Sequence, residues 1–294
     1  MIIALYGRTV GAEHAENIRL MFKLFAMHNV KLMVYAPFAD YLQSNLGVAS
    51  SGIERFNTPP EVKGKASLML SLGGDGTFLE SVSYVEDSEI PVAGINFGRL
   101  GFLAHITSEN MATAIEQLVN GDYLVEKRSA LHLSIDENSP LGFPYALNDI
   151  TIQKKGVAMI TINAYIDGEF LCTYWADGLI VSTPTGSTAY SLSVGGPIVS
   201  PKSNAFAISP ISPHNLTLRP LIIPDCSVLT FEVDTREQEI LISLDSRSIN
   251  IPGNCQVKMV KAPFRVGIVN LKDTGYFKTL RNKLMWGIDS RNPR

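Results

Sequence analysis

The residues best suited to chemistry lie in a glycine-rich stretch at positions 68–79. An apolar run at 68–72 breaks into the turn Gly-Gly-Asp-Gly-Thr at 73–77 and resumes at Phe78. This order predicts a buried strand, a tight turn and the start of a helix. Bare glycine backbone and the free N–H groups of a helix start suit an anion. Because the carboxylate of Asp75 would repel a phosphate unless a metal intervened or a hydroxyl gave it a proton, the stretch indicates a phosphate beside a hydroxyl.

The glycine turn also has a plainer interpretation, because most turns of this composition are only turns. Two commoner phosphate-binding motifs are excluded by the sequence. The dinucleotide fingerprint requires a glycine where Leu79 stands, and the chain contains no Gly-Lys-Ser or Gly-Lys-Thr of a P-loop. The functional interpretation of the turn therefore depends on the residues that accompany it.

The residues before the turn predict the opening of an α/β domain. Apolar runs at 1–6 and 30–35 predict two strands, and between them a helix is indicated by apolar residues at helical spacing, namely Ile18, Met21, Phe22 and Phe25. Residues 47–65 are rich in Ser, Gly and Pro, and they predict a mobile connection to the strand that precedes the turn.

A second glycine-containing loop follows the turn and its helix. A buried strand is expected at 91–95, and the loop at 96–103 then lies at the carboxyl edge of the sheet, where open α/β sheets bind ligands. We expect this loop near Asp75. Asn96 and Arg99 could reach a ligand, although an arginine that caps a helix end is at least as common. A helix capped near Thr107 or Ser108 should follow, with Met111, Ala114, Ile115 and Leu118 on its inner face.

From about Tyr123 the sequence becomes rich in strand patterns separated by turns, including a hairpin signal at Asp167-Gly168. Strands are expected at 124–135, 145–153, 159–166, 169–175, 221–223, 228–233, 239–244, 256–260 and 266–271. A helix is expected at 277–286, and it could return to the first domain. The predicted domains are 1–122 plus 272–294, which is α/β, and 123–271, which is β-rich.

The β-rich half contains a segment of unusual composition at 177–193. It begins with Asp177 and holds five hydroxyl residues between Ser182 and Thr188, interrupted by Pro184 and Gly186. One interpretation is a Ser/Thr-rich turn whose hydroxyls cap a following helix. The other is a binding surface with many hydrogen-bond donors, small residues and one carboxylate, which would suit a ribose or an amide.

Length and composition narrow the class of protein. A chain of 294 residues with 46% hydrophobic content can bury a large core and should divide into two domains. A net charge of −3 with 18% charged residues gives no broad attraction to nucleic acid or anionic membranes. The sequence shows no signal peptide and no membrane-spanning run, so we expect a cytoplasmic protein. Three widely spaced cysteines predict reduced, buried thiols.

Four segments together resemble the bacterial NAD kinase family. They are the turn at 73–77, the loop at 96–103, Leu147-Asn148-Asp149, and the segment 177–193, in this order and at these separations. The resemblance extends from about Leu68 to Trp286, and Pro213-His214, Arg219-Pro220 and Asp245-Ser246-Arg247 add to it. The glycine motif alone is shared with diacylglycerol, sphingosine and phosphofructokinase-like kinases, whereas the long segment 177–193 is specific.

The resemblance implies an α/β N-terminal domain, a β-sandwich-like C-terminal domain and an active site in the crevice between them. It implies transfer of the γ-phosphoryl group of ATP to the 2′-hydroxyl of the adenosine ribose of NAD, with a divalent metal such as Mg²⁺ and a homodimer or homotetramer. No metal ligand is assigned to the chain itself, and neither nucleic acid nor membrane is expected as a partner.

The resemblance also implies roles for individual residues. Asp75 would accept the proton, and Gly76 would contact the cofactor nearby. Asn148 and Asp149 would hold the adenosine-side ribose, Asp177 would bind toward the nicotinamide end, and Arg247 would contact NAD. The adenine and ribose pocket would be lined by Thr188, Ala189, Tyr190, Ser191, Leu192 and Ser193. Phosphate contacts or positioning could come from Gly73, Gly74, Thr77 and Arg99.

The sequence departs from the family pattern at three positions. Asp149 stands where many relatives have glutamate, Glu80 stands where relatives often have a basic residue, and Trp175 lies at a position that varies and could affect the choice between NAD and NADH. Two other functions stay open at this point. A lipid or sugar kinase could use the same glycine turn, although the chain has no marked basic amphipathic stretch. A dinucleotide-binding regulator could have lost transfer activity, although Asp75 and Asn148 are both present.

Overall fold

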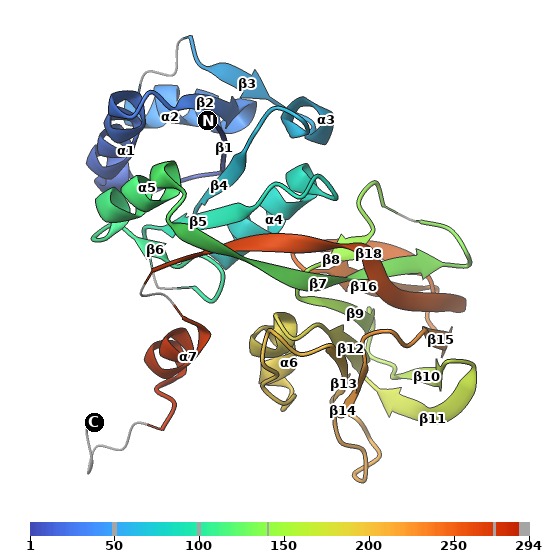
Figure 1. The fold of residues 1–294 in the computed structure, drawn as a ribbon. Coiled ribbons are helices and arrows are strands. Elements are labelled where there is room, and N and C mark those ends of the chain that lie inside the picture. The colour runs from blue at the N-terminus through green and yellow to red at the C-terminus, as the bar shows by residue number, and fades with distance from the viewer. Residues whose placement is uncertain (49–51, 99–100, 140, 273–274, 288–294) are drawn as a thin grey trace. The chain divides into compact units, whose positions relative to one another are not determined.

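The computed structural model describes residues 1–48, 52–98, 101–139, 141–272 and 275–287, which form two compact units. The first unit contains Met1–Lys127 and the chain from Val266 onward, and the second contains Arg128–Arg265. Figure 1 shows the order of their elements along the chain. The expected boundaries lay between residues 122 and 123 and between residues 271 and 272, a few residues from the observed ones. The difference arises because two long strands begin in one unit and end in the other, namely β7 (Tyr123–Ile135) and β18 (Cys255–Leu271).

The first unit is built on a parallel sheet in the order β18-β5-β4-β1-β2-β3, with β6 beside β5. Its strands, apart from β18, are β1 (Ile2–Gly7), β2 (Lys31–Tyr35), β3 (Glu54–Phe56), β4 (Leu68–Leu72), β5 (Val92–Asn96) and β6 (Ile106–Thr107). Its α-helices are α1 (Ala15–Met27), α2 (Ala36–Leu46), α3 (Pro59–Val62), α4 (Asp75–Val85), α5 (Met111–Asn120) and α7 (Tyr276–Leu284), and a 3-10 turn, η1 (Ala12–His14), precedes α1.

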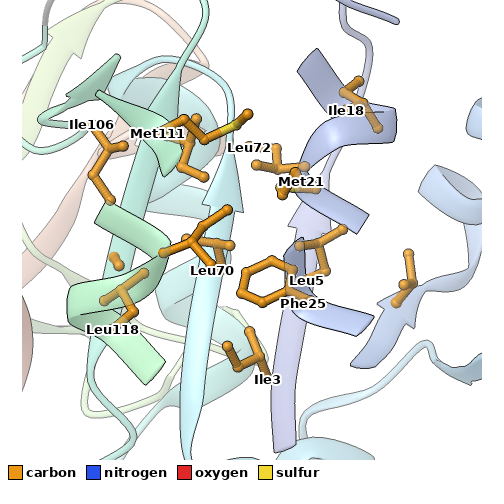
Figure 2. Close-up of a cluster of buried hydrophobic side chains, with 14 of the residues drawn as sticks. Ile3, Leu5, Ile18, Met21, Phe25, Leu70, Leu72, Ile106, Met111 and Leu118 are labelled. Atoms are coloured by element: carbon orange, nitrogen blue, oxygen red, sulfur yellow. The ribbon is translucent and has the colours of Figure 1, made fainter. Parts of the chain in front are cut away.

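Apolar side chains on alternating strand positions fix the helices of the first unit to the two faces of its sheet. Figure 2 shows α1 and α5 facing the same side of β1 and β4, with Phe25 of α1 against Leu5 and Leu70. Tyr6 points to the other face, because successive side chains in a strand alternate, and its ring lies 5.0 Å from that of Tyr84 in α4. The strand–helix–strand opening and its apolar helix face are therefore confirmed.

Two expectations about the first unit were wrong. The connection expected at 47–65 contains the strand β3, which pairs with β2, and the short helix α3. Helix α3 begins with a capping box in which Thr58 and Glu61 bond each other's backbone N–H groups, a signal that the sequence carried. The N-cap of α5 is Asn110 rather than Thr107 or Ser108, although its buried face is the one predicted.

The second unit is a sandwich of two antiparallel sheets. One sheet has the order β14-β13-β12-β9-β16-β17, and the other has the order β11-β10-β15-β18 with β7 and β8 at its side. The remaining bounds are β8 (Tyr145–Ala146), β9 (Asp149–Lys154), β10 (Ile160–Ile166), β11 (Glu169–Ala176), β12 (Gly178–Ser182), β13 (Ala205–Ile211), β14 (Leu221–Pro224), β15 (Leu229–Asp234), β16 (Glu239–Leu244) and β17 (Arg247–Pro252), with a 3-10 turn η2 (Gly186–Thr188) and helix α6 (Tyr190–Ser193) after β12.

Alternate residues of facing strands form the core of this sandwich. Ile150, Ile152 and Val181 come from one sheet, and Ile162 and Phe231 come from the other. The predicted β-rich, sandwich-like unit is therefore present. The two strands expected at 256–260 and 266–271 are one continuous strand, β18. The strands β12, β13 and β17 were not predicted from the sequence.

Two further features bear on the expected class of protein. None of the helices in the described parts of the chain is long and apolar enough to cross a membrane. The three cysteines are free thiols, but the expectation that they are buried was wrong, because Cys226 is exposed and Cys172 and Cys255 are only partly buried.

Candidate functional site

The glycine turn follows β4 and begins α4, as the sequence predicted. Gly73 has φ +147°, and a Cβ there would lie 2.5 Å from Oγ1 of Thr77, so only glycine fits this position. Gly74 is the N-cap of α4, and the space beside Gly74 and Gly76 is open. The first N–H groups of a helix have no partner within the helix, and here the backbone beside Asp75 is uncrowded at both glycines, an arrangement that suits a phosphate.

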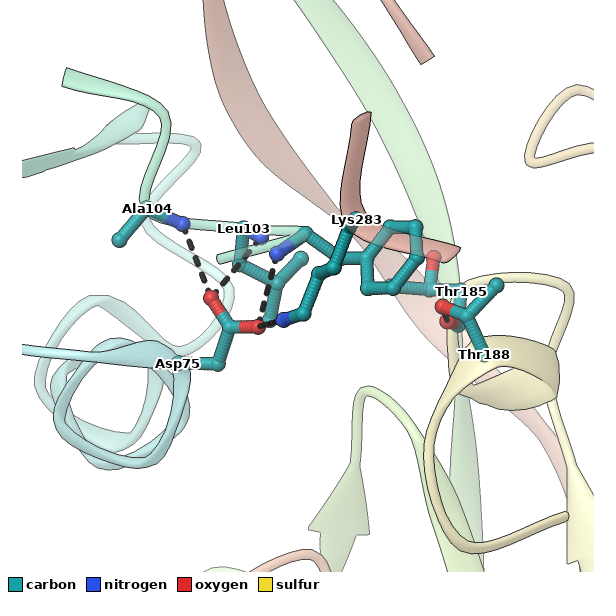
Figure 3. A network of polar contacts seen from close by, with 7 residues as sticks. Asp75, Leu103, Ala104, Thr185, Thr188 and Lys283 are labelled. Atoms are coloured by element: carbon teal, nitrogen blue, oxygen red, sulfur yellow. Dashed lines mark hydrogen bonds and ion pairs between the residues drawn. The ribbon is translucent and has the colours of Figure 1, made fainter. Parts of the chain in front are cut away.

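Asp75 is the first residue of α4, and the main chain of a neighbouring loop holds its carboxylate. The N–H of Phe102 donates to Oδ2 at 2.8 Å, and the N–H groups of Leu103 and Ala104 donate to Oδ1 at 3.0 Å and 3.1 Å. Figure 3 shows Asp75 facing Leu103 and Ala104. The expectation that the loop after β5 lies near Asp75 is confirmed, and three donors fix the direction of this carboxylate.

Lys283 adds a positive charge at the same carboxylate. Its Nζ lies 3.5 Å from Oδ2 of Asp75, and it comes from the last turn of α7 (Figure 3). The C-terminal helix expected at 277–286 therefore exists and returns to the first unit. Lys283 was not identified as a site residue from the sequence. The sequence pointed to it only through the two basic residues in the last turn of the expected helix, Arg281 and Lys283.

The loop residues and Glu80 make contacts of their own. Oδ1 of Asn96 accepts the N–H of Gly98 at 2.8 Å, so this side chain shapes the loop. Arg99 lies outside the described residues. The Oε2 of Glu80 accepts the Tyr6 hydroxyl and pairs with Nε of Arg8 at 2.6 Å. The negative charge of Glu80 is thus balanced by Arg8, which follows the end of β1.

In the second unit, a buried carboxylate organises the turn that carries Asn148 and Asp149. Asp245 accepts the backbone N–H groups of Leu147, Asn148 and Asp149 at 2.8 Å, 2.7 Å and 3.2 Å. Burial raises the pKa of Asp245, while these donors and Arg247 act in the opposite direction. Asp245 therefore fixes the backbone from which the two predicted ribose contacts project.

Asp149 lies close to the backbone of Tyr190, the first residue of helix α6, and is nearly fully buried. Burial, followed by the nearby charge of Asp245, raises the pKa of Asp149 to about 7, and the backbone N–H of Tyr190 acts against this shift. The Tyr190 hydroxyl in turn accepts a hydrogen bond from Nε2 of Gln153 at 2.9 Å. The structure thus brings Asp149 and Tyr190 together, and it adds Gln153, which the sequence did not indicate.

Several hydroxyls of the segment 177–193 are already bonded to other groups of the protein. Thr183 donates to the carbonyl of Leu147 at 2.6 Å, and Ser187 donates to that of Pro184 at 2.7 Å. Ser191 is buried and pairs with Ser209 at 3.2 Å. Five residues of the segment reach the protein surface. Thr188, Ala189 and Leu192 are partly exposed, and Tyr190 and Ser193 are exposed. Thr183, Ser187 and Ser191 therefore serve the fold, and the interpretation of the segment as a binding surface stays a prediction for its exposed residues.

Asp177 and Arg247 already have protein partners. Nζ of Lys154 lies 2.5 Å from Oδ1 of Asp177. The guanidinium of Arg247 donates to the carbonyls of Phe143 and Tyr145 and lies 5.0 Å from the centre of the Phe143 ring. Arg247 thus supports the loop at 143–145. Asp177 and Asp149 lie at opposite ends of the paired strands β9 and β12, about 16 Å apart at roughly 3.3 Å per residue.

The raised pKa of Asp149 predicts how stability depends on pH. Between about pH 4 and 7 the native carboxyl keeps a proton that the unfolded chain has lost, so the free energy of unfolding should fall as the pH rises through this window and level off above it. Between pH 5 and pH 8, the free energy of unfolding in urea should therefore fall less for Asp149→Asn than for the wild type. The difference should be about 3 kcal/mol, because the window from pH 5 to the native pKa of about 7 spans two units at about 1.4 kcal/mol each.

The matched control for this experiment is Asp234→Asn, which removes a carboxylate from an exposed position of the same unit. It should lose as much stability between the two pH values as the wild type does. Equal losses in the wild type and in Asp149→Asn would contradict the buried, protonated state of Asp149.

Comparisons with known proteins identify the family of this chain. Residues 17–123 match the family model of the ATP-NAD kinase N-terminal domain, and residues 147–271 match that of the C-terminal domain. A protein of Cytophaga hutchinsonii named NAD kinase is 44% identical over 294 residues, covering 99% of this chain and 100% of the relative.

Two solved structures have the same fold. One is a yeast NADH kinase complexed with NADH, with a TM-score of 0.89 and 22% identity over 100% of this chain and 90% of the other. The other is an NAD kinase from Archaeoglobus fulgidus in complex with ATP, with a TM-score of 0.75 and 25% identity over 97% of this chain and 99% of the other. The family models and the full-length relative show that this chain belongs to the NAD kinase family.

Proposed function

We propose that this chain transfers the γ-phosphoryl group of ATP to the 2′-hydroxyl of the adenosine ribose of NAD, which yields NADP and ADP. The observation that carries the proposal is the carboxylate of Asp75, which three backbone N–H groups hold beside the open glycine turn. An acid in an anion-binding turn repels a phosphate unless a metal or a hydroxyl lies between them. Membership of the NAD kinase family supports a ribose hydroxyl as the partner of Asp75.

The proposed transfer needs little covalent work from the protein. The oxygen of the 2′-hydroxyl forms a bond to the γ-phosphorus, and its proton passes to the carboxylate of Asp75. The bond from the γ-phosphorus to the bridging oxygen breaks, and its electron pair stays on the β-phosphate of ADP. Because a carboxylate is a weak base toward an alcohol, Asp75 acts mainly by aiming the hydroxyl and takes the proton as the new bond develops.

The divalent metal of this reaction is proposed to enter with ATP. Within the described parts of the chain, no three His, Cys, Asp or Glu side chains form a group that could hold a metal ion. The described residues therefore offer no three-ligand site for a resident metal. Kinases of this class commonly use Mg²⁺ bound to the phosphate oxygens of ATP, which requires no dedicated cluster of acids on the protein.

NAD is proposed to bind through residues of the second unit. Asn148 and Asp149 would hold the adenosine-side ribose, and Asp177 would bind toward the nicotinamide end. The separation of about 16 Å between Asp149 and Asp177 supports contacts with two different parts of a dinucleotide. The exposed surface of α6 would face the adenosine. Ser191 would act through the side chain of Ser209 with which it pairs, and Arg247 would act through the backbone carbonyls that it holds.

A steady-state assay tests the proposed function. The purified chain is incubated with Mg²⁺, ATP and NAD, and NADP is measured with an NADP-dependent dehydrogenase. NADP formation that requires both ATP and NAD is the expected result. Binding of NAD without formation of NADP would favour a regulator that has lost activity, and phosphorylation of a lipid or sugar but not of NAD would favour the other kinases that share the glycine turn.

Asp177→Ala should raise the KM for NAD by about 10-fold with little change in kcat, because the variant loses hydrogen bonds that the substrate makes in both the ground state and the transition state. Steady-state kinetics with varied NAD measure the effect. Asp234→Ala, at an exposed position of the same unit, is the matched control and should behave as the wild type. An unchanged affinity of Asp177→Ala for NAD in calorimetry would exclude the proposed contact.

A cytoplasmic location and assembly into a homodimer or homotetramer are proposed with this function. Both proposed substrates are metabolites of the cytoplasm, which supports the location. The assembly rests on the family resemblance, and light scattering of the purified chain at several concentrations would measure it.

A further inference from the structure

We propose that Lys283 is a second charged residue of the phosphoryl transfer, which leaves Asp75 when the substrates bind and pairs with the γ-phosphoryl group of ATP. The inference rests on the proposed function and deepens it, because it gives α7 a part in the reaction. Nζ of Lys283 lies 3.5 Å from Oδ2 of Asp75 (Figure 3), and it lies 4.7 Å from the centre of the Phe102 ring.

The first step of the argument is the hydrogen-bonding capacity of Asp75. An ionised carboxylate has about four acceptor positions, two on each oxygen. Oδ1 accepts the N–H groups of Leu103 and Ala104, and Oδ2 accepts the N–H of Phe102 and the ammonium of Lys283. A ribose hydroxyl can donate to Asp75 only if one of these four donors leaves. Lys283 makes the longest of the four contacts, and it is the only donor that is not main chain.

The second step is the ease with which this contact breaks. The side chains of Lys283 and Asp75 are 34% and 27% exposed, and ion pairs in such partly hydrated positions contribute little stability. The lysine side chain has a flexible stem of four carbons, so its ammonium can change partner without movement of the helix. The ion pair therefore does not fix Lys283 at Asp75.

The third step is the balance of charge during the reaction. A γ-phosphoryl group that approaches a hydroxyl bound to Asp75 must come close to a carboxylate, and the two repel each other. An ammonium already at that carboxylate is within reach of the incoming phosphoryl oxygens. When the ammonium of Lys283 moves from Asp75 to the phosphoryl group, Oδ2 of Asp75 becomes free to accept the hydroxyl. The ammonium also neutralises part of the negative charge of the phosphoryl group, which reduces the repulsion between this group and Asp75.

Phe102 keeps the ammonium of Lys283 close to the site while this ammonium moves from Asp75 to the phosphoryl group. Its ring lies beneath the ammonium, an arrangement in which the electron-rich face of the ring attracts a cation. The backbone N–H of the same residue is bonded to Oδ2 of Asp75. One residue thus ties both charged groups to the loop that follows β5.

A binding experiment tests the contact without any turnover. Lys283→Met keeps an unbranched stem of similar length and removes the charge. Calorimetry with Mg²⁺ and the β,γ-imido analogue of ATP should show about 10-fold weaker binding to this variant, as expected for loss of one charge-assisted hydrogen bond, whereas ADP should bind within about twofold of wild type. An equal loss for the two nucleotides, or no loss for the analogue, would overturn the proposal.

A kinetic experiment with matched variants tests the role in the reaction. Lys283→Met should lower kcat by about 100-fold, the loss typical of removing one charge-stabilising donor from an active site, and the Kd for NAD should stay unchanged. Lys283→Arg, which keeps the charge, should recover most of the rate. Arg281→Ala, at an exposed position of the same helix, should behave as the wild type.

The outcomes separate this inference from the function on which it rests. A wild-type chain that forms no NADP would remove the proposed function. A wild-type chain that forms NADP, together with a Lys283→Met variant of unchanged kcat, would overturn only the role of Lys283. A slow Lys283→Met variant that Lys283→Arg does not improve would also overturn it, because the charge would then not be the property that matters.

Discussion

Replacement of Asp75 by asparagine is expected to lower kcat for NADP formation by at least about 100-fold, while the Kd for NAD stays within about twofold of wild type. The amide keeps the size of the carboxyl group and an oxygen that can accept the N–H groups of Leu103 and Ala104. It cannot accept the proton of the 2′-hydroxyl, and its NH₂ group would face the N–H of Phe102. The loss should therefore fall on the chemical step.

Steady-state kinetics for kcat and calorimetry for NAD binding measure the two quantities separately. Asp87→Asn is the matched control, because Asp87 is an exposed carboxylate shortly after the end of α4 whose partner is Lys63. The control should keep wild-type kinetics. A turnover of Asp75→Asn close to that of the wild type would remove Asp75 from the reaction.

The local part of this site could be predicted from the sequence. The apolar run before Gly73, the glycines themselves and the apolar residues after Thr77 determine a strand, a turn and a helix through interactions between near neighbours. The same holds for the helix face of α1 and for the Asp167-Gly168 hairpin, in which both residues have positive φ. Such patterns need no information about distant residues.

The partners of Asp75 could not be predicted in this way. Its backbone donors lie 27 to 29 residues away along the chain, and Lys283 lies 208 residues away. Only the parallel pairing of β4 with β5 brings the loop after β5 to the same edge of the sheet as the glycine turn. The sequence placed this loop near Asp75, but it could not show that main-chain groups rather than side chains would hold the carboxylate.

The hydroxyl-rich segment shows a different limit. Its composition predicted a surface of donors, yet the hydroxyl of Ser187 bonds within the segment, and those of Thr183 and Ser191 bond Leu147 and Ser209 elsewhere in the second unit. Which hydroxyls face outward depends on where β12 ends and α6 begins, and β12 was not predicted. Asp245 was noted for its family resemblance, but its contact with the turn at 147–149 depends on the pairing of β16 with β9.

The second large effect is expected at Gly101, in the loop that holds Asp75. A Cβ on this residue would overlap both the Oδ1 and the carboxyl carbon of Asp75, which three hydrogen bonds keep in place. Gly101→Ala must therefore push the carboxylate away from its position or open the loop. A displacement of about 1 Å in a catalytic group can cost about 100-fold in rate, so kcat should fall by about this factor with NAD binding preserved.

Gly98→Ala provides the matched control in the same loop. A Cβ on Gly98 would lie 3.5 Å from Oδ1 of Asn96, an ordinary van der Waals contact, and neither glycine has the positive φ that would strain an alanine. The two variants add the same methyl group to the same loop, and only one of them displaces Asp75. If kcat falls equally in Gly98→Ala and Gly101→Ala, the loop affects the reaction in a way that does not depend on the position of Asp75. If Gly101→Ala alone loses rate, and kcat falls while the Kd for NAD does not, the position of the Asp75 carboxylate limits the reaction.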